Sequence, residues 1–192
     1  MPIRYPGPDA AARSLRSGHA DAVGVLLTET LSYAFTDPAA VLFLQGLAEA
    51  GEHAGVSLLL VPALPVGSEA AAVREAVVDG FVVYSMPSDH PGVLAVLERR
   101  LPTVVVDEPR QEGMPFVGID DRAAAAVTPA LTTVRQPLLD KGRIAGQLML
   151  GQQEPPPGGE VLLPTELVVR ASTAPPPAPA TVRKTNEKKG TA

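Results

Sequence analysis

The chain has 192 residues, of which 45% are hydrophobic and only 4% aromatic, so it can form one ordinary domain around a core of alanine, valine and leucine. It contains no cysteine, which excludes disulfides and thiolate metal sites. The formal net charge of −5 argues against a general nucleic-acid binder, so any contact with DNA must be local.

Residues 1–21 are predicted to form a hinge-like segment. Within it, Leu15 lies between Arg13 and Arg16, next to Ser14 and shortly before an apolar strand. Arginines neutralise phosphates or enter a narrow minor groove, and a leucine between them can wedge a base step open. We therefore predict that these four residues contact DNA. The alternative is a solvated N-terminal helix with two exposed arginines.

Strand and helix patterns alternate from residue 22 onward. Apolar runs predict strands at 22–27, 57–62, 81–84, 103–106 and 116–119, and apolar residues at helical spacing predict helices at 38–54, 69–78 and 91–99. This alternation indicates an α/β fold, a doubly wound parallel sheet that is covered on both faces. Ligands of such sheets bind beyond the carboxyl ends of the strands.

Local signals mark the ends of the first and third of these helices. Asp37 is a suitable N-cap for the first, Pro38 suits its first helical position, and Gly55 ends it. Ser88 or Asp89 is expected to cap the third helix.

The alternation weakens after Asp120. Four consecutive alanines precede a strand-like run at 131–134, which we expect to join the same layered sheet as the early strands. An amphipathic helix is predicted from Leu138 to Leu150, and Gly151 ends it.

The last part of the chain holds one further apolar pattern. Residues 161–163 and 167–169 are interpreted as one strand that Pro164 interrupts. Residues 174–192 are rich in proline and alanine and then basic, and they are predicted to be disordered.

Acidic residues after two strands raise the question of an enzyme or metal site. Asp107, Glu108, Asp120 and Asp121 could hold Mg²⁺ through oxygen ligands. A receiver domain, however, would need carboxylates directly after the first and third strands, and this chain lacks them there. No Gly-rich phosphate loop, dinucleotide motif or nucleophile elbow occurs. We therefore predict no catalytic residue, no metal site and no cofactor, and interpret the three histidines as solvated.

Several segments, taken in order, resemble the LacI/GalR family of bacterial repressors. They are Pro8–Gly18, Ala22–Leu27, Val78–Val83, Leu101–Asp107, Val117–Asp121, Leu131–Pro137, the helix with Lys141, Gly142 and Gly146, and Leu163–Thr173. Their order is more specific than any single segment, and they cover most of residues 5–174. The resemblance implies one lobe of the periplasmic-binding-protein type, flavodoxin-like in topology, over residues 22–173.

Two features depart from the family pattern. Family members begin with a helix-turn-helix that reads the major groove, and nothing before Tyr5 is long enough for one. In the family, the segment that follows the position of Asp121 leads into a whole second lobe. Here only a few residues join Asp121 to the run that begins at Leu131. We therefore expect a truncated regulator. Its last strand, near 166–170, would lack its usual sheet and would pair elsewhere, lie exposed or be disordered.

The resemblance also implies an effector-binding wall on this lobe. Tyr33 and Phe35 could stack on a sugar or base ring, or could equally pack at a helix entrance. Asp120 is favoured as an acceptor for ligand hydroxyls, and Asp121 as the N-cap of the alanine segment. The predicted effector-binding residues are Tyr33, Phe35, Ser85, Asp107 and Asp120.

The implied function is transcriptional regulation, with operator DNA, a sugar-like effector and a second copy of the chain as partners. In the family, paired hinge helices insert leucine into the minor groove. Effector binding shifts the equilibrium between the state in which these helices are formed and the state in which they are not. With half of the cleft absent, we expect weak effector binding and impaired control. The alternatives are a small-molecule binding module without a DNA role, or a dimerisation fragment. We find no signal-peptide pattern and no run of membrane-spanning length, so we expect a soluble cytoplasmic protein.

Overall fold

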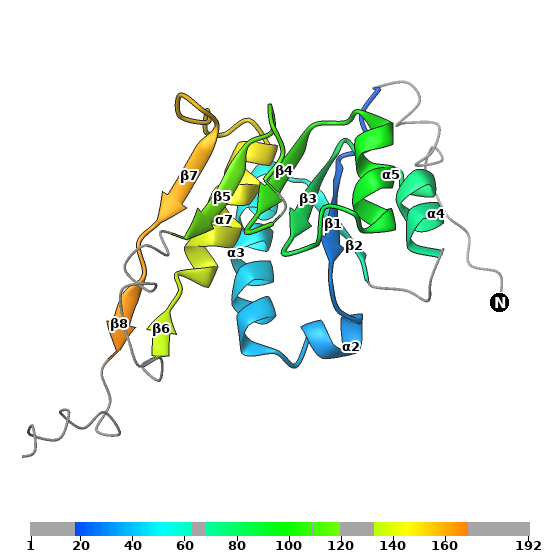
Figure 1. Cartoon of the computed structure of the whole chain (residues 1–192). Coiled ribbons are helices and arrows are strands. Elements are labelled where there is room, and N and C mark those ends of the chain that lie inside the picture. Colours follow the sequence, from blue (N-terminus) through cyan, green and yellow to red (C-terminus); the bar gives the residue numbers. More distant parts are fainter. Residues whose placement is uncertain (1–17, 63–67, 109, 120–132, 169–192) are drawn as a thin grey trace, which may run out of the picture.

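The main feature of the computed structural model is a six-stranded sheet. The structure describes residues 18–62, 68–108, 110–119 and 133–168. All neighbouring strands of the sheet pair in parallel, in the order β2-β1-β3-β4-β5-β7 (Figure 1). These strands are β1 (Ala22–Leu27), β2 (Ser57–Val61), β3 (Gly80–Tyr84), β4 (Thr103–Val106), β5 (Phe116–Ile119) and β7 (Glu160–Leu163). Because they run in one direction, their carboxyl ends share one edge of the sheet.

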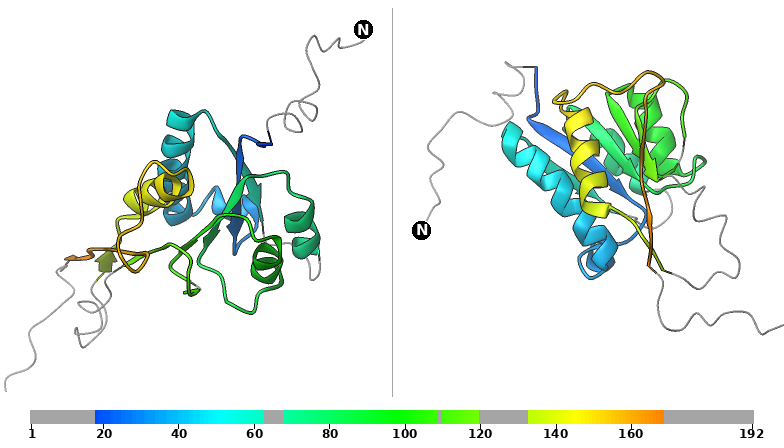
Figure 2. Two further views of the ribbon diagram at one scale, coloured as in Figure 1. Left: turned by 90° about the horizontal axis from the view of Figure 1, so that it is seen from above. Right: turned by 90° about the vertical axis from the view of Figure 1, so that its left-hand side faces the viewer.

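Helices cover both faces of this sheet. α3 (Pro38–Ala54) and α7 (Leu138–Met149) lie on one face, and α4 (Ser68–Glu75) and α5 (Pro91–Arg99) on the other (Figure 2). Two separate cores result: one contains Phe43 of α3, and the other contains Phe81 on the opposite face of the sheet. The predicted doubly wound fold is confirmed, and the strand order of β1 to β5 is the flavodoxin-like order.

The ends of α3 follow the local sequence signals. The Asp37 carboxylate accepts a hydrogen bond of 3.0 Å from the Ala40 backbone N–H, and Pro38 occupies the first turn. Gly55 adopts a left-handed φ of 69° at the C-cap, where a side chain would be strained. All three predictions for this helix are confirmed.

The start of α5 differs from the prediction. The N-cap is His90 rather than Ser88 or Asp89: its Nδ1 accepts a hydrogen bond of 3.2 Å from the Gly92 N–H. Since Nδ1 is the acceptor, the ring proton lies on Nε2, which is 3.1 Å from the buried carboxylate of Glu69 in α4. This contact to a neighbouring helix favours the histidine as cap, and sequence spacing does not reveal it.

α3 and α7 approach each other through glycines. A Cβ atom on Gly46 would overlap the Leu139 carbonyl group, and one on Gly142 would overlap the Phe43 carbonyl group. Backbone therefore packs directly on backbone where these two helices cross. Figure 2 shows them side by side on one face of the sheet.

The C-terminal strands also differ from the prediction. β6 (Thr133–Arg135) does not join the parallel sheet; it pairs antiparallel with β8 (Glu166–Val168) in a separate two-stranded sheet, here called the ribbon. β7 and β8 are thus two strands in two sheets, not one interrupted strand. An Arg135–Glu166 ion pair of 2.9 Å joins the ribbon's strands. Of the outcomes expected for the last strand, pairing elsewhere is the one observed.

The described residues form a single lobe with this ribbon attached. Only residues 120–132 separate β5 from β6, and these lie outside the described residues. Within the described ranges, no helix is both long and apolar enough to cross a membrane.

Candidate ligand-binding site

A cavity of about 740 Å³ lies at the carboxyl edge of the sheet. This is the edge at which doubly wound sheets bind their ligands. The residues that line the cavity follow β3 and β4, belong to β5, or precede α7. They are Ser85, Ser88, Asp107, Glu108, Arg110, Phe116, Gly118, Ile119 and Gln136.

Ser85 and Asp107 occupy equivalent positions, each directly after its strand. Both have left-handed backbone conformations, with φ of 52° and 65°. Their backbone N–H groups nevertheless extend the sheet: Ser85 N–H donates to Val106 O and Asp107 N–H to Val117 O, both at 2.9 Å. Non-glycine residues adopt this conformation rarely, and such strain gathers at functional sites. These two residues are therefore held in place by the sheet itself.

A buried lysine lies behind Asp107. The Lys141 side chain is fully buried, and its Nζ donates to Asp107 Oδ1 at 2.7 Å and to Oδ2 at 2.9 Å. The third bond, of 3.1 Å, goes to Gln136 Oε1. An ammonium has three N–H donors, so all of them are used. This network joins the end of β4 to the first turn of α7.

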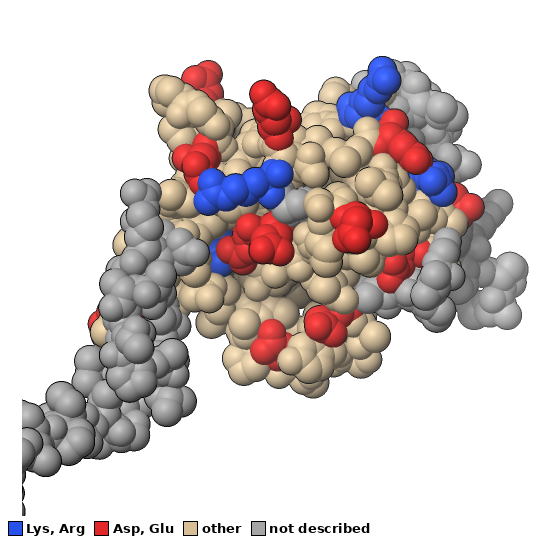
Figure 3. Space-filling view, in the orientation of Figure 1, with Lys and Arg blue, Asp and Glu red and all other residues tan. Residues whose placement is uncertain are grey.

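The other cation of the cavity is also engaged. The guanidinium carbon of Arg110 lies 4.3 Å from the centroid of the Phe116 ring, and Arg110 forms an ion pair with Glu160 at the start of β7. The Glu108 side chain is exposed at the cavity. On the face shown in Figure 3, acidic and basic side chains of the described residues alternate, without one broad area of either sign.

Tyr33 and Phe35 do not line this cavity. They lie in and directly after the short helix α2 (Leu31–Ala34), which Thr30 caps and which the sequence did not predict. Tyr33 is 53% exposed and Phe35 59% exposed, and both precede the start of α3, so stacking on a ligand and packing at the helix entrance both remain predictions. The structure does not bring them together with Ser85 and Asp107 in one cavity.

Tyr84, the last residue of β3, connects the cavity edge to the core. Its ring stacks on Phe43 with centroids 4.1 Å apart. Burial raises the pKa of the Tyr84 hydroxyl to about 12, and the negative charges of Asp107 and Asp37 add to this. Tyr84 is therefore a neutral, packed side chain beside Asp107 at neutral pH.

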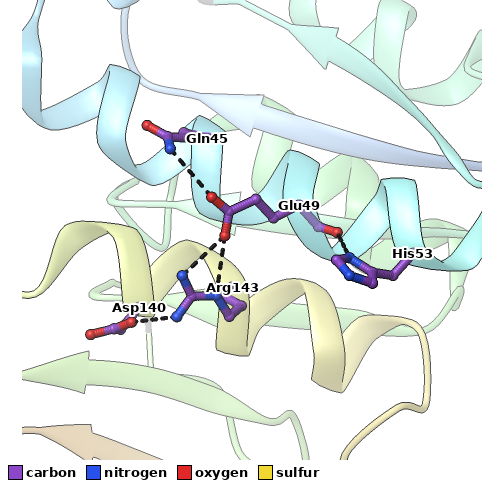
Figure 4. Close-up of polar contacts among 5 residues, drawn as sticks. All are labelled: Gln45, Glu49, His53, Asp140 and Arg143. Carbon is purple, nitrogen blue, oxygen red and sulfur yellow. Dashed lines mark hydrogen bonds and ion pairs between the residues drawn. The ribbon is translucent and has the colours of Figure 1, made fainter.

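A second polar cluster joins α3 to α7 away from the cavity (Figure 4). The Arg143 guanidinium donates to Glu49 Oε2 at 3.0 and 3.2 Å and to Asp140 Oδ1 at 2.6 Å. The bonds from Arg143, and a further one from Gln45, hold the pKa of Glu49 below its ordinary value. The same pair raises the pKa of Arg143. The Glu49 and Arg143 side chains of this cluster are partly exposed and connect the two helices, and none of its residues lines the cavity.

The remaining predicted site residues cannot be placed. Arg13, Ser14, Leu15, Arg16 and Asp120 lie outside the described residues. Conversely, sequence reasoning gave no binding role to Lys141 or Gln136. A signal existed for the lysine, because Lys141, Ala145 and Leu148 recur at the spacing of one helix face, and the latter two are core residues.

Comparisons with known proteins agree on the family. The model of the periplasmic binding protein-like domain matches residues 12–173. The HTH-type transcriptional regulator Rv3575c of Mycobacterium tuberculosis is 52% identical over 129 residues, which is 64% of this chain and 35% of the relative. The HTH-type transcriptional regulator IpsA of Corynebacterium glutamicum is 46% identical over 144 residues, 72% of this chain and 38% of the relative. The chain thus spans little more than a third of the length of these relatives.

A solved structure supports the fold. A LacI family transcriptional regulator of Enterococcus faecium with bound ribose superposes with a TM-score of 0.60 at 16% sequence identity, over 80% of this chain and 99% of that chain. The family match, the named relatives and the single doubly wound lobe point to one conclusion. This chain belongs to the family of periplasmic binding protein-like domains.

Proposed function

We propose that this chain is the effector-sensing lobe of a LacI-type transcriptional regulator and that its effector is a sugar-like molecule. The observation that carries the proposal is the cavity at the carboxyl ends of β3, β4 and β5, with Ser85 and Asp107 on its wall. Asp107 offers carboxylate oxygens and Ser85 a hydroxyl, the groups that orient polyhydroxylated ligands. The role is regulatory rather than catalytic and belongs to the cytoplasm, where the DNA is.

Calorimetric titration of the purified chain with neutral sugars tests the effector proposal. The described residues supply one wall, so we expect weak binding. A ligand present at ten times its Kd should still raise the free energy of unfolding by about 1.4 kcal/mol. Asp107→Asn should weaken binding by at least about tenfold, because a charge-assisted hydrogen bond is lost, whereas Glu98→Gln, a remote exposed variant, should leave it unchanged. Equal binding by both variants would contradict the assignment of Asp107.

We further propose that Arg13, Ser14, Leu15 and Arg16 contact DNA. Fluorescence anisotropy with operator-like and random duplexes at several salt concentrations provides the test. Each lost phosphate contact should flatten the slope of log K against log salt by about 0.9. Arg13→Ala should reduce the slope, and Leu15→Ala should weaken binding with the slope kept. Binding that neither substitution changes, or no binding at low salt, would contradict the proposal.

Homodimerisation is the third part of the proposed function. Three large apolar side chains on the outer surface of α3 and on the edge strand β2 are at least 40% exposed: Val41, Leu42 and Leu59. Apolar surface of this kind is typical of protein interfaces. Sedimentation equilibrium should give a dimer mass, and Leu42→Glu should shift it to the monomer. A monomer at all concentrations would contradict this part alone.

A further inference from the structure

The polar groups of the cavity define the class of ligand that it can accept. We propose that the cavity selects uncharged polyhydroxylated ligands over phosphorylated ones, and that Lys141 is the positioning residue for this selection. The inference rests on the proposed function, in that a small molecule occupies the cavity. Beyond the proposed function, the inference specifies that the ligand is uncharged and assigns a role to Lys141, which does not itself line the cavity.

Lys141 is buried at a position that suits an apolar side chain. It shares one face of α7 with the core residues Ala145 and Leu148. Burying an ammonium costs free energy that its ion pair must offset, and an apolar residue of similar size would avoid this cost. The lysine therefore contributes something other than packing. What it contacts is the carboxylate of Asp107, through both oxygens.

This contact fixes Asp107 as a hydrogen-bond acceptor. An ionised carboxylate has about four lone-pair sites, of which Lys141 occupies two. The Asp107 side chain is 24% exposed and lines the cavity, so the remaining sites are open to a ligand hydroxyl. Because the Lys141 side chain is fully buried and its three donors are used, it offers nothing to a ligand phosphate.

Lys141 also orients Gln136. An ammonium only donates, so the atom of Gln136 that faces it must be the amide oxygen. The NH₂ group of Gln136 is then the donor left for the cavity, which Gln136 lines. The cavity thus presents a fixed acceptor from Asp107, a fixed donor from Gln136, and the hydroxyl of Ser85. A sugar hydroxyl both donates and accepts, and it matches this set.

The charges around the cavity disfavour an anion. Among the described residues, Lys141 is paired with Asp107, and Arg110 with Glu160. Glu108 adds an exposed carboxylate to the lining. A phosphate in the cavity would approach the Glu108 carboxylate, and the repulsion between these like charges costs free energy.

Calorimetry with matched ligands tests this inference on the full chain. The pairs are glucose with glucose 6-phosphate and ribose with ribose 5-phosphate, at constant ionic strength. The neutral member of at least one pair should bind, and its phosphorylated partner should bind at least about tenfold more weakly. Glu108→Gln should reduce this ratio, whereas the remote variant Glu98→Gln should not.

The role of Lys141 is tested by the variant Lys141→Met/Asp107→Asn, which removes both charges and leaves no buried ion. Neutral ligands should lose about tenfold in affinity, as expected when a charge-assisted hydrogen bond is replaced by a neutral one. The affinity of the phosphorylated ligands should not fall. A purely structural role of Lys141 would weaken both classes equally, and that result would overturn its assignment.

Two outcomes separate the inference from the proposed function. Tighter binding of a phosphorylated ligand than of its neutral partner would overturn the inference and leave the cavity as an effector site. Absence of binding by every ligand of both classes, up to about 10 mM, corresponds to less than about 3 kcal/mol of binding free energy and would overturn the proposed function together with the inference.

Discussion

The glycine contact between α3 and α7 makes a quantitative prediction about stability. In Gly142→Ala, the new methyl group would overlap the Phe43 carbonyl group and lie 2.9 Å from its carbon and 3.0 Å from Leu47 N. An ordinary carbon contact needs at least 3.4 Å. Both contacts are backbone atoms, which cannot rotate away as a side chain can. The two helices must therefore separate, and packing around Phe43 and Leu47 is lost.

The expected loss can be estimated from two opposing effects. Alanine favours a helix interior over glycine by about 1 kcal/mol. Overpacking a tight contact costs about 1–3 kcal/mol, and more where backbone must move. We expect a net destabilisation of about 2 kcal/mol, which lowers the melting temperature by roughly 4–8 °C in a domain of this size. Thermal unfolding followed by circular dichroism measures this shift.

Gly51→Ala is the matched control within α3. Its methyl group would approach nothing closer than Val56 O, at 3.0 Å, so the gain in helix propensity should offset most of the crowding. We expect this variant to lie within about 1 kcal/mol of the parent protein. If Gly142→Ala proved as stable as Gly51→Ala, the direct backbone contact between the two helices would be refuted.

Three further predictions concern charged and titratable groups. Asp107→Asn should lower the free energy of unfolding by about 3 kcal/mol, because it leaves the Lys141 ammonium buried without a counter-ion. Adding Lys141→Met should recover most of this loss, as measured by urea unfolding. Additive losses from the two substitutions would contradict the ion pair. Arg143 lowers the pKa of Glu49, so the Glu49 carboxylate stabilises the fold above pH 4.5, and this stabilisation is lost as pH falls through the lowered pKa. Arg143→Gln should raise the Glu49 pKa in an NMR titration. An unchanged pKa would count against the contact. The pKa of the Tyr84 hydroxyl is raised from 10.0 to about 12, so the unfolded chain loses the hydroxyl proton at a lower pH than the folded chain, and the free energy of unfolding should fall as pH rises from 10 to 12. Tyr84→Phe should remove the last step of the tyrosinate absorbance titration. A titration that Tyr84→Phe leaves unchanged would refute the raised pKa.

Much of the sheet could be predicted from the sequence because its strands are continuous apolar runs. β1, β4 and β5 have the predicted bounds, since a strand buried on both faces excludes polar residues along its whole length. The ends of α3 were predictable for a related reason. Asp37 and Gly55 satisfy backbone groups within a few residues, so no distant contact is needed.

The features that the sequence did not reveal depend on distant contacts. An apolar run such as the one at 131–134 shows that a strand is favoured, but not which strand it pairs with; β6 pairs with β8, more than thirty residues later. His90 caps α5 because a buried glutamate of α4 lies beside it. The spacing of α7 places Lys141 on the core face, but the sequence does not show that its partner is Asp107, which β4 brings within 2.7 Å of it.

The close packing of α3 on α7 also affects how the lobe can move. Helices that touch backbone to backbone cannot slide past each other without breaking many contacts at once, so α3 and α7 shift as one rigid body. The first turn of α7 carries Lys141, beside the cavity, and the outer surface of α3 carries Val41 and Leu42. The Lys141–Asp107 ion pair and the helix contact thus connect the cavity edge to the outer surface of α3 through a continuous series of packed groups.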